Sequence, residues 1–255
     1  MSWVLDYPLL VFAACLVAFR LSVSIGTQLA RRFPSPEEGW REDFSTVLGA
    51  SLTLLGLIIG FTFAMAVSRY DQRKNLEEEE ANAIGTEFAR ADLLPVADAS
   101  KVRDLMRGYY EQRVLFYTTR DAEQLKRVDA RTAQLQGEMW SAVVASAGTS
   151  LLPAHALVIS GMNDVLNAQG YAQAAWWNRI PTAAWVLIAA IAVCCHVLIG
   201  FGARNPKLER VLLFVLPLVV SIAFFLVADI DSPRGGVIRV QPINLTSIAA
   251  SLRER

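Results

Sequence analysis

What the sequence lacks is charge along three long runs. Residues 44–68, 181–203 and 211–228 contain no Asp, Glu, Lys or Arg, although charged residues make up 19% of the 255-residue chain. A helix that packs on the core of a soluble protein keeps a polar face, so uncharged runs of this length are typical of membrane spans. The three runs exclude an ordinary soluble enzyme, a secreted disulfide scaffold and a disordered chain.

Cysteine and histidine are also scarce, and neither sign of charge is in excess. The chain has 3 cysteines and 2 histidines, and 24 basic residues balance 24 acidic ones. Cys194, Cys195 and His196 are consecutive, so on a helix their side chains point about 100° apart and do not converge on one metal ion. The balanced charge gives no indication of nucleic-acid binding. No catalytic motif is present in the sequence, and we expect no enzyme activity, no cofactor and no metal.

Four segments are apolar enough to span a membrane: residues 8–25, 46–68, 181–202 and 211–229. The charged region between the second and third segments has helical spacing and no alternating strand pattern. We therefore predict an all-α integral membrane protein with four transmembrane helices and a helical extramembrane domain between the second and third. The expected divisions are 1–68 for the first transmembrane pair, 69–180 for the helical domain, 181–230 for the second pair and 231–255 for a C-terminal segment.

Basic residues do not orient the chain in the membrane. Six of them lie near the span ends on each side, so the positive-inside rule gives a tie. One further charge, Arg20, lies well inside the first span. There it either has a functional role or extends its side chain to the membrane interface.

Two stripes of residues distinguish the second span. One consists of small residues, which allow close backbone approach between helices in lipid. It packs within one four-helix bundle or holds subunits together around a shared axis, and its glycines are Gly49, Gly56 and Gly60. The other stripe contacts lipid and neighbouring helices, or forms a hydrophobic constriction on the axis of an oligomer. Its members, spaced by four, are the candidate pore-lining residues Thr53, Leu57, Phe61 and Met65.

Two carboxylates, Asp229 and Asp231, lie at the end of the fourth span. The helix dipole disfavours negative charge at a helix C-terminus, so we expect at least one of them to pair with an arginine such as Arg69 or Arg234. These four residues are the predicted membrane-edge charges. A structural salt bridge and an ion-binding role are the two alternatives for them.

Residues 79–86 (EEANAIGT), 90–95 (RADLLP) and 228–236 (ADIDSPRGG) resemble motifs of a bacterial bestrophin-like family of unknown function. The Gly60-Phe61 pair, followed by Arg69 and Tyr70, resembles the segment after the pore helix in bestrophin chloride channels. The resemblance implies a pentamer in which the second span lines a path for small anions such as chloride, with the helical domain in the cytosol.

The same resemblance implies a multi-pass protein of the bacterial inner (plasma) membrane. The expected partners are the lipid bilayer, further copies of the chain in a homo-oligomer, and small inorganic ions. The alternative function is a non-conducting membrane adaptor or sensor whose helical domain binds a partner.

Overall fold

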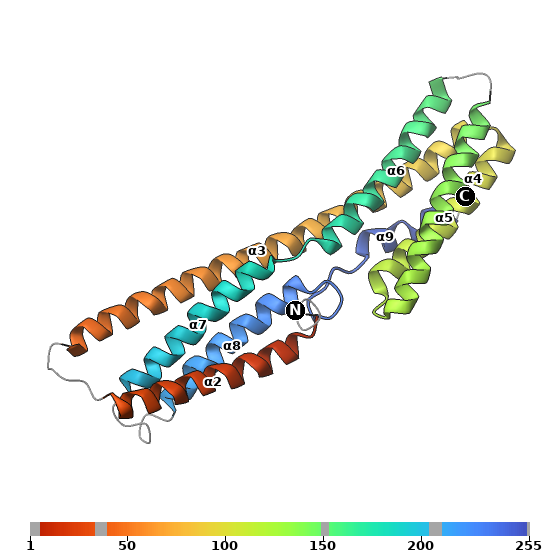
Figure 1. The fold of residues 1–255 in the computed structure, drawn as a ribbon. Coiled ribbons are helices and arrows are strands. Elements are labelled where there is room, and N and C mark those ends of the chain that lie inside the picture. Colours follow the sequence, from red (N-terminus) through yellow and green to blue (C-terminus); the bar gives the residue numbers. More distant parts are fainter. Residues whose placement is uncertain (1–5, 34–39, 149–152, 204–210, 254–255) are drawn as a thin grey trace. The chain divides into compact units, whose positions relative to one another are not determined.

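The computed structural model describes residues 6–33, 40–148, 153–203 and 211–253, and all regular secondary structure in these ranges is helical. The all-α prediction is therefore confirmed for this part of the chain. Figure 1 shows the elements in chain order, which are α2 (Pro8–Arg32), α3 (Trp40–Arg90), the 3-10 helix η1 (Ala91–Leu93), α4 (Val96–Thr118), α5 (Ala122–Ala147), α6 (Pro153–Trp177), α7 (Thr182–Gly202), α8 (Leu212–Asp231), α9 (Ile243–Ser247) and α10 (Ala249–Arg253).

The helices form two compact units. The first contains residues 1–69 and 179–239, and the second contains residues 70–178 and 240–255. Helix α3 belongs to both units. No proline interrupts residues 40–90, so the helix continues without a break. It therefore passes through the boundary that we expected between residues 68 and 69. The second unit also includes residues 240–255, which the sequence divisions treat as a separate segment.

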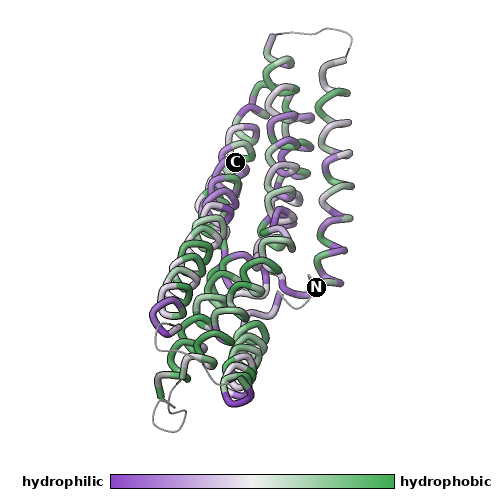
Figure 2. Tube along the Cα trace, turned by 60° about the vertical axis from the view of Figure 1, so that its left-hand side comes forward, coloured by the Kyte–Doolittle hydropathy of each residue, from purple (hydrophilic) through white to green (hydrophobic). Residues whose placement is uncertain are grey.

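The first unit contains the most apolar helices, coloured green in Figure 2. Among the described residues, four helical stretches are long and apolar enough to cross a membrane, and each overlaps one predicted span: Pro8–Arg32, Trp40–Leu93, Pro153–Gly202 and Leu213–Asp231. Proline sets two of the helix starts, because its fixed φ suits the first turn and its missing N–H is not needed there. Pro8 is the first residue of α2, and Pro181 immediately precedes α7.

Helices α2 and α7 cross at two glycines. A Cβ atom at Gly26 would collide with the carbonyl oxygen of Val197, and one at Gly200 would collide with that of Val23. The missing side chains let the two backbones touch, which maximises van der Waals contact. Close packing through small residues therefore joins α2 to α7 in this unit, and the sequence did not predict it.

The second unit has a conventional hydrophobic core. The later part of α3 and helices α4, α5 and α6 bury Ile84, Met106, Met139 and Met162 together. Helix α5 begins where Asp121 accepts a hydrogen bond from the N–H of Gln124 (2.9 Å), which satisfies one of the free amides of the first turn. Leu245 of α9 and Leu252 of α10 belong to the same core, so the C-terminal helices are part of this unit.

Candidate functional site: the outward face of α3

The first part of α3, which is residues 40–69 in the first unit, has one buried face and one exposed face. Leu55, Thr62 and Ala66 are buried, and their spacings of seven and four place them on one side of the helix. The predicted pore-lining residues are exposed on the remaining sides. Phe61 is 62% exposed, Leu57 53% and Met65 38%, and Thr53 is exposed as well. These four side chains therefore point away from the core of their own chain.

The predicted packing glycines of α3 are also open. A Cβ atom at Gly49, Gly56 or Gly60 would meet no described atom within 4 Å. The contrast with Gly26 and Gly200, where a Cβ atom meets backbone, is sharp. Of the two alternatives for this stripe, packing within one four-helix bundle has no support among the described residues.

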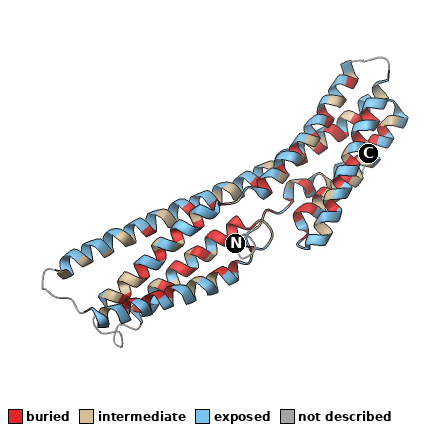
Figure 3. Cartoon of the chain, viewed as in Figure 1, coloured by how far each residue is buried: buried red, intermediate tan, exposed pale blue. Residues whose placement is uncertain are grey.

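The span in α3 is less buried than the other three. Only 17% of its most apolar window is buried, against 28% for Pro8–Arg32, 33% for Pro153–Gly202 and 50% for Leu213–Asp231. Figure 3 shows this part of α3 mostly in pale blue, the colour of exposed residues. A helix with so large an apolar surface outside its own unit needs lipid or another protein surface around it.

The two carboxylates at the end of α8 accept hydrogen bonds from backbone amides. The Asp229 carboxylate accepts from the N–H groups of Val237 and Ile238, both at 2.8 Å. The Asp231 carboxylate accepts from the N–H of Ile180 at 3.0 Å and from the Arg179 guanidinium at 3.4 Å. Arg179 was not among the expected partners, because it precedes a different span and only the fold brings it to Asp231.

Arg20, the charge inside the first span, contacts α8. Its Nη1 donates a hydrogen bond to the carbonyl oxygen of Leu213 (3.0 Å), and its guanidinium lies 5.5 Å from the ring centre of Phe214. Leu213 lies four residues before Pro217, and proline has no N–H to bond that carbonyl in the helix. Arg20 therefore replaces the hydrogen bond that Pro217 removes from α8.

Two buried charges in the second unit pair with each other. The Arg113 guanidinium pairs with the Glu80 carboxylate, which also accepts a hydrogen bond from the Tyr117 hydroxyl (2.9 Å). Burial is the largest single effect on the pKa of Arg113 and lowers it, but the charge of Glu80, the hydrogen bond to Glu80 and the two nearby tyrosines together raise it, so the net shift is upward. Burial, followed by the Glu80 charge, raises the pKa of Tyr117, so the hydroxyl stays protonated as a donor. This cluster is structural, because every charge in it already has a partner.

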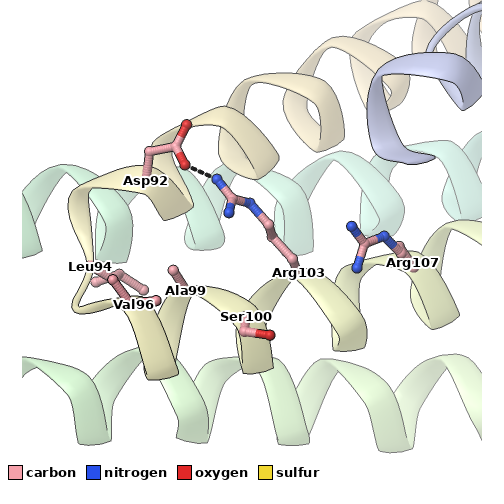
Figure 4. A pocket seen from close by; sticks show the side chains of 7 residues that line it. All are labelled: Asp92, Leu94, Val96, Ala99, Ser100, Arg103 and Arg107. Atoms are coloured by element: carbon pink, nitrogen blue, oxygen red, sulfur yellow. Dashed lines mark hydrogen bonds and ion pairs between the residues drawn. The ribbon is translucent and has the colours of Figure 1, made fainter. Parts of the chain in front are cut away.

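One pocket lies where η1 leads into α4, with a volume of about 220 Å³. Figure 4 shows the Arg103 guanidinium directed at the Asp92 carboxylate across it. The second arginine of the lining, Arg107, pairs with Asp104 (2.7 Å) and donates to the Leu252 carbonyl oxygen (2.7 Å). Both guanidinium groups are engaged by the chain itself, so the pocket does not offer free positive charge to a ligand. The described residues also contain no group of three or more His, Cys, Asp or Glu side chains that could hold a metal ion.

A family model described as Bestrophin-like domain matches residues 15–245. The chain belongs to the bestrophin-like family. Its fold is also similar to crystal structures of a bacterial bestrophin homologue from Klebsiella pneumoniae. One of these, a point variant, has a TM-score of 0.66 and 13% sequence identity over 95% of this chain and 98% of that one. Another, phased with zinc, has a TM-score of 0.65 and 12% identity over 95% and 97%. No curated protein matches the sequence.

This bestrophin-like chain is thus a membrane protein of known fold. Because its sequence identity to the two crystal structures is low, the similarity to them concerns the fold alone. Sequence reasoning found the motifs of the family and the two stripes of α3. It missed Gly26, Gly200 and Arg179, and it found Arg20 without its partner. Pro217 was a signal for the partner of Arg20, because a proline inside a span leaves the carbonyl four residues before it without a hydrogen bond.

Proposed function

We propose that this protein is an oligomeric channel in which the first part of α3 from each subunit lines a common axis, and that small ions pass along this axis. The observation that carries the proposal is the exposed apolar face of α3, with its open glycine stripe. Membership of the bestrophin-like family supports the same function.

The arrangement of the two stripes suits a ring of helices. A helix has about 3.6 residues per turn, so the buried stripe through Leu55 takes one side of α3 and leaves the remaining sides for other contacts. Each helix of a ring needs a flat surface toward its neighbour and another surface toward the axis. We assign Gly56 and Gly60 to the first surface, since small residues allow close approach. We assign Thr53, Leu57, Phe61 and Met65 to the second.

Phe61 forms the narrowest apolar point of the proposed path. Bulky apolar side chains repeated around an axis exclude water when the radius is small, and such a constriction gates by dewetting. The family resemblance favours five subunits and a small anion such as chloride. It also favours the bacterial inner membrane, with residues 70–178 in the cytosol.

Ion flux through the purified protein in liposomes tests the proposal. We expect wild-type protein to be oligomeric by native mass spectrometry and Phe61→Ala to raise the leak of chloride, because a smaller side chain widens and wets the constriction. Leu21→Ala in α2 is a matched control, since Leu21 is 58% exposed on a helix that we do not place at the axis.

Two results would contradict the channel. A monomeric wild type would leave α3 without neighbours, and four helices with so few polar residues offer no internal path for ions. An oligomer without flux, in which Phe61→Ala and Leu57→Ala change nothing, would favour the adaptor or sensor instead.

A further inference from the structure

Glu87, in the part of α3 that belongs to the second unit, is fully buried. Neither of its carboxylate oxygens has a hydrogen-bond partner. It lies against Gly161 of α6, where a Cβ atom would collide with the Glu87 carboxylate and with the Arg90 guanidinium. The carboxyl group therefore occupies the space that a side chain at position 161 would take, so a larger residue there would require the Glu87 and Arg90 side chains to shift.

The charges nearest to Glu87 come from α3 and α6. The nearest charge on α3 is Arg90, one turn further along the helix, and the nearest charge on α6 is Asp164. The Arg90 Nη1 atom lies 4.0 Å from Oδ2 of Asp164, at the limit of an ion pair. Arg90 is thus placed between two carboxyl groups, and its described ion pair is with Asp164.

The charges of α4 are directed elsewhere. Arg103 and Arg107 lie over the ring of Phe88, at 5.5 and 5.3 Å from its centre, and pair with acids outside this contact. The other titratable group on this part of α6 is His155, six residues before Gly161. Glu87 therefore has Arg90 as its one nearby source of positive charge among the described residues of these helices.

A buried carboxylate without hydrogen bonds is unfavourable, because it loses its hydration and gains nothing in return. Burial raises the pKa of Glu87 to about 8; Arg90 opposes this shift and Asp164 adds to it. The packing of α6 on α3 accordingly favours the neutral acid over the carboxylate.

We propose that Glu87 is a proton-binding site that latches α6 to α3 in the second unit. While the carboxyl group is neutral, it packs against Gly161 and leaves Arg90 to Asp164. When the proton is released to solvent, the carboxylate draws Arg90 toward itself, and the contact at Gly161 loosens to admit water. The latch does not depend on ion conduction by α3.

The sign of the pH dependence follows from linkage. The folded state holds the Glu87 proton up to pH about 8, whereas an unfolded glutamate loses it near its ordinary value of about 4.5. Between these values the folded state binds more protons than the unfolded state, so stability falls as pH rises. The contribution is fully present below pH 4.5 and is lost by pH 8.

Thermal unfolding of the full chain in detergent, from pH 5 to pH 9, tests the latch. Glu87→Gln keeps the shape of the neutral acid and has no proton to lose, so its melting temperature should decline less than that of the wild type between pH 5 and pH 8. Glu79→Gln, on an exposed position of the same helix, should follow the wild type. His155→Gln in both backgrounds separates any contribution of the histidine.

Two measurements on the wild type keep the proposal testable if Glu87→Gln fails to fold. Infrared spectroscopy should detect a protonated, buried carboxyl group at pH 6.5 that disappears above pH 8. Amide hydrogen exchange in α6, corrected for the intrinsic effect of pH, should become faster over the same range. An ionised Glu87 at pH 6.5, or equal pH profiles for wild type and Glu87→Gln, would overturn the latch.

Discussion

Polar side chains in the first unit are placed where the backbone leaves a group without a partner. Arg20 bonds the carbonyl that Pro217 frees, and Asp229 bonds two amides of the segment that follows α8. Charge-assisted hydrogen bonds to backbone groups stabilise more than neutral ones, at about 1.5–3 kcal/mol each. These side chains therefore stabilise irregular backbone at the ends of the spans.

The link between Arg20 and Pro217 makes a prediction for a double-mutant cycle. Arg20→Met should cost about 1–3 kcal/mol of unfolding free energy, because the Leu213 carbonyl is left without a donor. In a Pro217→Ala background the new N–H can bond that carbonyl within α8, so the same substitution should cost less. Chemical denaturation in detergent measures both values.

Gln28→Ala serves as the control for this cycle, since Gln28 is an exposed polar residue of the same helix. It should have little effect in either background. If the penalties of Arg20→Met and Pro217→Ala simply add, Arg20 does not act through the Leu213 carbonyl.

At the scale of the element, α3 differs from the other spans because it packs least on its own chain. A Cβ atom at Gly26 of α2 or Gly200 of α7 would meet neighbouring backbone, whereas Gly49, Gly56 and Gly60 of α3 are open. The two sets should therefore respond differently to large side chains.

Gly200→Leu should prevent correct folding of the first unit, because its side chain has no space beside the Val23 carbonyl. Gly56→Leu combined with Gly60→Leu should leave each chain folded, since the space there is open, but should weaken assembly. Circular dichroism reports the fold and native mass spectrometry the number of subunits. Full assembly of the double variant would show that this stripe is not an interface.

The sequence was sufficient to predict the spans and to locate the two stripes of α3. It was insufficient to predict which residues contact one another. Runs without charge and spacings of four are local signals, so hydropathy and periodicity predicted them. The continuity of α3 from Trp40 to Arg90 was missed because a change from apolar to charged residues resembles a boundary, although a helix passes through it freely. The pairing of Asp231 with Arg179 depends on which spans are neighbours, and no local pattern reports that.

At the scale of the whole molecule, the family and the exposed face of α3 point to the same arrangement of subunits around an axis. The described residues form an apolar unit with four candidate spans and a second unit in which Arg113 pairs with Glu80 and Glu87 has no hydrogen-bond partner. In the proposed channel, Phe61 faces a path through which ions move.

Modification of a cysteine at position 61 tests whether Phe61 faces the ion path. In a background without Cys15, Cys194 and Cys195, Phe61→Cys would be recorded in a planar bilayer while a charged thiol reagent is added. We expect the current to change on modification, because a charge then sits at the constriction, and we expect no change for Leu21→Cys. An unaltered current through Phe61→Cys channels, with modification verified by mass, would contradict this placement of Phe61.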